Sequence, residues 1–124
     1  MSESTTTITG RLTAAPELSF ATAPVVNFTV AVTERRRQGD GWVDGPTSFF
    51  KCVAWRELAE HIAESVDKGD RVIVTGRLRQ RSWESDSGER RSRVEIEVDD
   101  LGPSLRWTNA EVIRPITSSS EAAA

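Results

Sequence analysis

The sequence predicts an all-β domain that contains one helix, and three patterns in the chain lead to this prediction. Several stretches alternate apolar and polar side chains, which is typical of strands with one buried face. Glycine, proline and aspartate separate these stretches, as expected for turns. Only residues 56–66 change to a period near four, which indicates an amphipathic helix.

Composition is that of an ordinary globular protein. Of the 124 residues, 37% are hydrophobic and 28% are charged, which fits one domain with one core. No apolar run is long enough to span a membrane, and residues 1–5 lack the features of a signal peptide, so we expect a cytoplasmic protein without membrane partners. One cysteine and one histidine cannot form an internal disulfide or a zinc site, so we expect no metal and no cofactor.

The first two strands are expected at residues 5–12 and after Pro24. In the first, Ile8 and Leu12 share one face and threonines occupy the other, and an Ala-Pro-Glu sequence at residues 15–17 ends it. In the second, alternate positions from Val26 onward are large and apolar, which predicts a buried face.

Three consecutive arginines, Arg35, Arg36 and Arg37, lead from the second strand into a glycine-rich connection that carries Trp42. We interpret residues 38–46 as a hairpin connection to the third strand. A basic run and a ring on one loop suit a nucleic-acid partner. A solvated strand end explains the arginines equally well.

The third strand places Phe49, Lys51 and Trp55 on one face, while the even-numbered positions 50–54 face the core. Large rings beside a cation can stack on unpaired bases while the cation contacts phosphate, and each stacked base contributes about 1–3 kcal/mol. The alternative is that Phe49 and Trp55 pack in a core or an interface.

The helix at residues 56–66 ends before a Lys-Gly-Asp sequence, which suits a helix C-terminus. His61 lies on this helix, and Cys52 lies on the core side of the third strand. Nothing else in the chain completes a catalytic set with them, so we expect a binding protein rather than an enzyme.

The fourth strand, residues 71–83, carries a basic stripe. Arg77, Arg79, Arg81 and Trp83 share parity, and the same parity would place Ile73 beside them. We therefore expect a bulge at position 76, a glycine, that resets which side chains face the core.

The return strand, after a turn at residues 84–89, adds Arg91 and Arg93 to the stripe. Residues 71–93 hold seven arginines against three carboxylates, which is a local positive charge within a chain of net charge −3. Arginines at a sheet edge can also prevent aggregation. The interleaved tryptophan favours binding instead.

Five strands with one helix between the third and fourth predict a five-stranded Greek-key barrel of the OB-fold type, and such barrels bind oligonucleotides across one face. Residues 104–113, which include Trp107, predict an extra C-terminal strand. We expect residues 1–115 to form the single domain and residues 116–124, which are small and polar, to form a short disordered tail.

The chain resembles the bacterial single-stranded DNA-binding proteins over about residues 5–114. The matching motifs lie at residues 8–12, 16–18, 49–60, 68–78 and 81–83. The resemblance implies that Phe49, Trp55 and Trp83 stack on bases and that Lys51, Arg79 and Arg81 are their basic neighbours. A further stacking position of the family falls near Arg35 or Arg36, where this chain has a cation and Trp42 is the candidate replacement.

The resemblance also implies a homotetramer. Residues 102–115 resemble the actinobacterial branch, whose added C-terminal strand clamps neighbouring subunits, so Trp107 and Leu105 are assigned to the oligomer interface together with Thr7 and Thr9. Family members that act in replication usually end in an acidic, phenylalanine-tipped segment. This chain ends in Glu-Ala-Ala-Ala, so we expect a shortened chain or an accessory paralogue that does not recruit replication or repair enzymes through such a tip.

We therefore predict a non-enzymatic, nucleoid-associated protein that binds and protects single-stranded DNA with little sequence preference in replication, recombination or repair. Single-stranded RNA remains an alternative, because only a contact to the 2′-hydroxyl separates the two. An oligomeric scaffold without nucleic-acid binding is a second alternative, which the acidic balance favours. The predicted DNA-binding residues are Phe49, Lys51, Trp55, Trp83, Arg35, Arg36, Arg37, Trp42, Arg77, Arg79, Arg81, Arg91 and Arg93.

Overall fold

A computed structural model describes residues 4–114 and folds them into six strands and one helix. The elements are β1 (Thr5–Leu12), β2 (Glu17–Phe20), β3 (Pro24–Gln38), β4 (Gly41–Trp55), α1 (Arg56–Ser65), β5 (Arg71–Glu84) and β6 (Arg90–Pro103). The expected tail at residues 116–124, and with it the question of a recruiting tip, lies outside the described residues.

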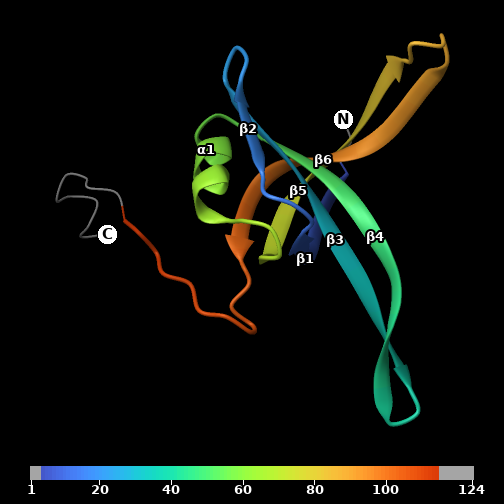
Figure 1. Cartoon of the computed structure of the whole chain (residues 1–124), viewed down its shortest axis with the longest axis vertical. Helices are drawn as coiled ribbons and strands as arrows, with labels where there is room; N and C mark the ends of the chain where they lie inside the picture. Colours follow the sequence, from blue (N-terminus) through green and yellow to red (C-terminus); the bar gives the residue numbers. More distant parts are fainter. Residues whose placement is uncertain (1–3, 115–124) are drawn as a thin grey trace.

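The strands form one sheet that closes on itself. Its order is β1-β5-β6-β4-β3-β2, and β1 also pairs with β3, which joins the two sides of the sheet. The remaining seam is a short parallel pairing of β4 with β6 at Cys52 and Ile96. Two long hairpins, β3–β4 and β5–β6, project from this closed centre in different directions (Figure 1).

The core lies inside the closed sheet and beneath α1. Val26 and Val30 on β3, with Val72 and Val74 on β5, are fully buried, which confirms the facing expected for β3. Ile62 on α1 is 2% exposed and joins the same cluster. Within residues 4–114, no helix combines the length and apolar character that a membrane crossing demands.

The helix begins at a constrained junction and ends at Ser65, one residue before the predicted end and without a basic residue in its last turn. Trp55 caps α1 in an extended conformation without a side-chain hydrogen bond, and Arg56 follows with a φ of 63°, which is uncommon for a non-glycine residue. At the other end Asp67 N donates to Asp70 Oδ2 at 2.8 Å, and Gly69 takes a φ of 87°. The chain therefore changes direction from β4 into α1 directly after Trp55.

We predicted that Gly76 changes which side chains of the strand at residues 71–83, now β5, face the core. This prediction is wrong. Val72 and Val74 are buried and Gly76 continues the same inward parity, while Ile73, 44% exposed, does lie on the face of Arg77. The register shift at Gly76 places the extra residue on β6 instead, because Thr75 pairs with Asp100 and Gly76 with Val98. A Cβ at Gly76 would lie 2.3 Å from the Glu97 carbonyl oxygen, so the glycine permits close backbone approach rather than a change of face.

Three element predictions need correction. β2, a four-residue strand at the outer edge that pairs with β3, was not among the predicted strands. Most of residues 38–46 belongs to the strands of one long hairpin, whose turn lies at Gly39 and Asp40.

The extra strand at residues 104–113 is not present in this chain. A strand needs a partner edge, and none of the six strands pairs with this segment. The chain bends at residues 106–108 instead, where Thr108 Oγ1 donates to Ser104 O at 3.3 Å and Ser104 N donates to Arg71 O at 2.8 Å.

Candidate nucleic-acid interface

Strand β4 presents two aromatic rings and a lysine on the outside of the closed sheet. Phe49 is 67% exposed and Trp55 is 44% exposed, whereas Cys52 and Ala54 between them are fully buried. The predicted alternation is therefore confirmed, and the alternative that these rings pack in the core is wrong for this chain.

The neighbouring strand leaves these side chains uncovered. Ala31 and Thr29 on β3 lie directly beside Phe49 and Lys51, and both are small. Among the described residues, no carboxylate lies within ion-pair distance of the Lys51 ammonium. A free cation between two exposed rings can contact a phosphate while the rings stack on bases.

The basic stripe on β5 forms as predicted. Arg79 and Arg81 have side chains that are 58% and 66% exposed, and Trp83 is 42% exposed at the far end of the strand. On β6, Arg93 pairs with Arg81 and Arg91 pairs with Trp83, so both return-strand arginines join the stripe.

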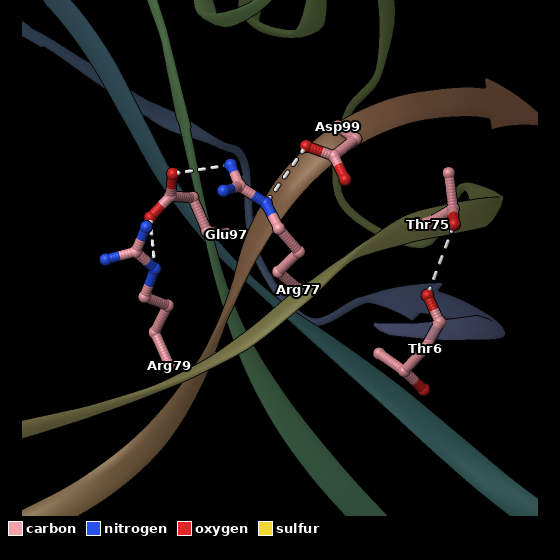
Figure 2. A network of polar contacts seen from close by, with 6 residues as sticks. All are labelled: Thr6, Thr75, Arg77, Arg79, Glu97 and Asp99. Carbon is pink, nitrogen blue, oxygen red and sulfur yellow. Dashed lines mark hydrogen bonds and ion pairs between the residues drawn. The ribbon is translucent and has the colours of Figure 1, made fainter. Parts of the chain in front are cut away.

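Sequence reasoning missed that acidic side chains on β6 neutralise much of this stripe (Figure 2). Arg77 Nη2 donates to Glu97 Oε1 at 2.8 Å, and Arg77 Nε lies 3.5 Å from Asp99 Oδ1. Arg79 Nε lies 3.2 Å from the second oxygen of Glu97. One carboxylate thus lies between two arginines of the predicted site.

A second carboxylate, that of Glu95, serves the outer part of the stripe. It is 3% exposed, and its oxygens lie 3.2 Å from Arg93 Nε and 3.7 Å from Arg81 Nη1. We name the whole set the arginine–carboxylate ladder. It comprises Arg77, Arg79, Arg81 and Arg93 with Glu95, Glu97 and Asp99.

The sequence did contain a signal for the ladder. Glu95, Glu97 and Asp99 recur with a period of two on the return strand, and residues 71–103 hold seven arginines and seven carboxylates. The positive charge counted over residues 71–93 therefore disappears when the count reaches the end of β6. The net charge of this surface therefore depends on β6 as well as on β5.

The pairing of neighbouring strands places the ladder beside the rings of β4. Val53, between Lys51 and Trp55, pairs with Glu97 on β6, and Glu97 pairs with Arg77 on β5. The inward partners in the same rows, Cys52 and Ile96, are buried. Rings, lysine and ladder therefore share one continuous outer surface across β4, β6 and β5.

The β3–β4 hairpin carries the remaining predicted residues. Trp42 is 58% exposed, and Arg35 Cζ lies 5.9 Å from the centre of its ring. Arg35 and Arg36 also lie 4.0 and 3.7 Å from carboxylates of Asp44 and Glu34. An exposed ring near the arginines agrees with Trp42 as the replacement for a stacking residue.

Trp83 has one ring face already occupied. Arg93 Cζ lies 5.2 Å from the centre of the Trp83 ring, which is within cation–π distance. A base that stacks on this ring therefore uses its other face or displaces the guanidinium. An open surface pocket of about 420 Å³ lies beside the Trp83 ring and is also lined by Gly88 and Arg90.

The residues assigned to an oligomer interface lie on the surface of the single chain. Trp107 is 60% exposed, and Arg71 Cζ and Arg106 Cζ lie 4.5 Å and 5.3 Å from the centre of its ring. Leu105 is 65% exposed. Thr7 Oγ1 donates to Thr75 Oγ1 at 3.2 Å, and Thr9 pairs with Ile73. The interface remains a prediction.

Cys52 is unsuited to nucleophilic chemistry. Burial, followed by the charge of Glu95, raises the pKa of its thiol to about 12, so the reactive thiolate is absent at neutral pH. The side chain is 0% exposed, which leaves it inaccessible to a disulfide with a second subunit in this fold. Among residues 4–114, no three potential metal-ligating side chains gather at one place.

Comparison with known proteins gives consistent matches. The model of the single-strand binding protein family matches residues 4–104. The chain is 56% identical over 114 residues to the single-stranded DNA-binding protein of Mycobacterium leprae, and the match covers 89% of this chain and 68% of that protein.

Two solved structures resemble the fold. The small single-stranded DNA-binding protein from Streptomyces coelicolor superimposes with a TM-score of 0.75 at 34% identity, over 85% of this chain and 97% of that one. A Plasmodium falciparum SSB in complex with single-stranded DNA gives a TM-score of 0.73 over 84% of this chain and 97% of that one, and at 22% identity it supports the fold alone. The predicted OB fold is confirmed.

Proposed function

The chain belongs to the single-strand binding protein family, and from this premise we propose that it binds and protects single-stranded DNA with little sequence preference and without catalysis. The observation that carries the proposal is the outer surface of β4, where Phe49 and Trp55 expose their rings on either side of Lys51, which has no carboxylate partner within residues 4–114. Exposing an apolar ring to water is unfavourable in the free protein, and a base that stacks on the ring removes this exposure.

Each group of residues has a distinct part in this proposal. Phe49, Trp55 and Trp83 stack on bases, and because every base has a π-face this contact tolerates any sequence. Lys51 and the arginines of β5 contact the phosphate backbone as it crosses the surface. Arg35 to Arg37 and Trp42 extend the path along the β3–β4 hairpin, which projects from the closed centre (Figure 1).

The alternatives have less support. An oligomeric scaffold that no longer binds nucleic acid does not account for exposed rings beside a lysine. Single-stranded RNA satisfies the same stacking and phosphate contacts, but no feature of the surface favours it over DNA. We therefore propose roles in DNA replication, recombination or repair, in the cytoplasm and close to the nucleoid.

We also propose that the protein acts as a homotetramer. The segment after β6 supports this, because Leu105, Val112 and Ile113 are 65%, 74% and 88% exposed and would be shielded from water by neighbouring subunits. Light scattering in dilute solution tests it. A stable monomer would contradict the assembly without affecting DNA binding.

The function is tested by titrating the full chain with poly-dT while following tryptophan fluorescence and gel mobility at two salt concentrations. Quenching and a mobility shift that weaken at high salt are expected, because rings stack on bases and cations replace counterions. Unchanged fluorescence and mobility at low salt would contradict the proposal. Competition with poly-U in the same assay ranks RNA against DNA.

A further inference from the structure

The arginine–carboxylate ladder lies on the proposed DNA-binding surface, yet its cations already have partners. Its four arginines face three carboxylates of β6, which leaves a net charge of only about one across the stripe. A surface built solely to attract phosphate has no use for these carboxylates. Figure 2 shows Glu97 placed between Arg77 and Arg79.

We propose that Glu97, with Glu95 and Asp99, competes with DNA phosphate for the arginines of β5 and so limits the affinity and the salt dependence of binding. This inference rests on the proposed function. An arginine leaves its carboxylate, or shares its remaining donors, when a phosphate arrives. Such exchange allows a bound strand to be released and repositioned more readily than the number of arginines suggests.

Exposure along the ladder decides which arginines exchange. Arg77 and Glu97 are 30% and 28% exposed, so their ion pair is only partly screened by water. Arg79 and Arg81 are 58% and 66% exposed, and if either moves away its carboxylate keeps a second arginine, Arg77 beside Glu97 and Arg93 beside the buried Glu95. Arg79 and Arg81 are therefore free to change partners at small cost, while Arg77 stays with Glu97.

Counterion release gives the measurable consequence. A phosphate contact to a single strand contributes a slope of about −0.7 in the logarithm of affinity against the logarithm of salt concentration. The carboxylate beside an exchanging arginine already neutralises part of its charge, so the arginine displaces fewer counterions from the DNA than a free cation does. The slope is therefore shallower than a count of cations predicts.

The competing explanation is that the carboxylates position the arginines for phosphate. Glu97→Gln separates the two, because glutamine keeps an oxygen that accepts a hydrogen bond and removes the charge. If Glu97 competes with phosphate, the substitution strengthens binding. If Glu97 chiefly positions Arg77 and Arg79, the substitution leaves binding unchanged or weakens it.

The experiment measures the affinity of the full chain for a fluorescent oligo-dT at four salt concentrations. We expect Glu97→Gln to bind about three- to tenfold more tightly at low salt and its slope to steepen by about 0.7–1.4, since the charge facing two arginines is removed. Glu64→Gln, an equal charge change on an exposed residue of α1, is the matched control and should change affinity less than about twofold.

Each outcome decides the matter. Tighter binding and a steeper slope for Glu97→Gln alone support the competition, whereas an effect equal to that of Glu64→Gln, or weaker binding, overturns it. Failure of the unmodified chain to bind oligo-dT contradicts the proposed function instead. If thermal melting shows that Glu97→Gln does not fold, Asp99→Asn, whose carboxylate lies 3.5 Å from Arg77, is measured under the same criteria with a smaller expected gain.

Discussion

Lys51 and Arg79 lie on the same outer surface but differ in whether a carboxylate already pairs with their positive charge. Among the described residues the Lys51 ammonium has no carboxylate partner, whereas Arg79 Nε lies 3.2 Å from Glu97. The difference comes from the strands beside them. Lys51 faces Thr29 across the sheet, while Arg79 lies beside the acidic face of β6.

Alanine substitutions should expose this difference in a salt titration with oligo-dT. Lys51→Ala should make the slope shallower by about 0.7, the value of one full phosphate contact to a single strand. Arg79→Ala should also make it shallower, but by less, because Glu97 already neutralises part of its charge. Equal changes for the two variants would contradict this ranking, and unaltered melting curves confirm that both variants fold.

Burial of the Cys52 thiol predicts how stability depends on pH. Its pKa rises from 9.0 to about 12 on folding, so the folded state favours the protonated thiol. The resulting stability is present below pH 9 and is lost as the pH rises toward 12. Urea unfolding of the native chain should therefore show a steeper loss of stability over this range than unfolding of Cys52→Ala. Parallel curves for the two proteins would contradict the account.

At the scale of elements, the β5–β6 hairpin depends on a close backbone approach at Gly76. The extra residue of the bulge, Asp99, lies on β6, and its carboxylate reaches Arg77. The glycine therefore supports both the closed sheet and the inner end of the ladder. The packing at Gly76 therefore affects the charge of the proposed binding surface.

Gly76→Ala should destabilise the fold by about 1–3 kcal/mol or more, because its Cβ would lie 2.3 Å from the Glu97 carbonyl oxygen and the backbone would have to shift. Gly102→Ala is the matched control, since nothing lies within 4 Å of a Cβ there. Urea unfolding measures both variants. Similar midpoints for the two would show that the close approach is relieved without cost.

The same elements show what sequence alone could predict. Period-two alternation fixes the facing of β3 and β4, so Phe49 and Trp55 could be placed on the outer surface before the structure. Glu95 and Glu97 could not be assigned to arginines without the register of β5 and β6, because pairing partners are many residues apart in the chain. The four residues of β2 are too few to show a period.

At the scale of the whole molecule, closure of the sheet brings distant segments onto one surface. The parallel seam between β4 and β6 places the rings of β4 beside the ladder, although the sequence separates them by a helix and a hairpin. A net charge of −3 is compatible with the proposed DNA-binding surface, because the proposed path relies on rings and a few cations rather than on total charge.

The segment after β6 differs from its prediction. The sequence predicts a C-terminal strand at residues 104–113, and none of the six strands of the single chain pairs with this segment. Trp107 instead lies within cation–π distance of Arg71 and Arg106 of the same chain. A strand that depends on a second subunit for its partner cannot form in one copy.

The central claim, that the outer surface of β4 binds single-stranded DNA by stacking, is tested most directly by the oligo-dT affinity of the double variant Phe49→Ala/Trp55→Ala. Phe20→Ala is the matched control, since Phe20 is 69% exposed on β2, outside the proposed surface. Loss of two stacked bases predicts an affinity about 100-fold weaker or more for the double variant, with melting little changed and Phe20→Ala unaffected. Unchanged affinity in a folded double variant would contradict the claim.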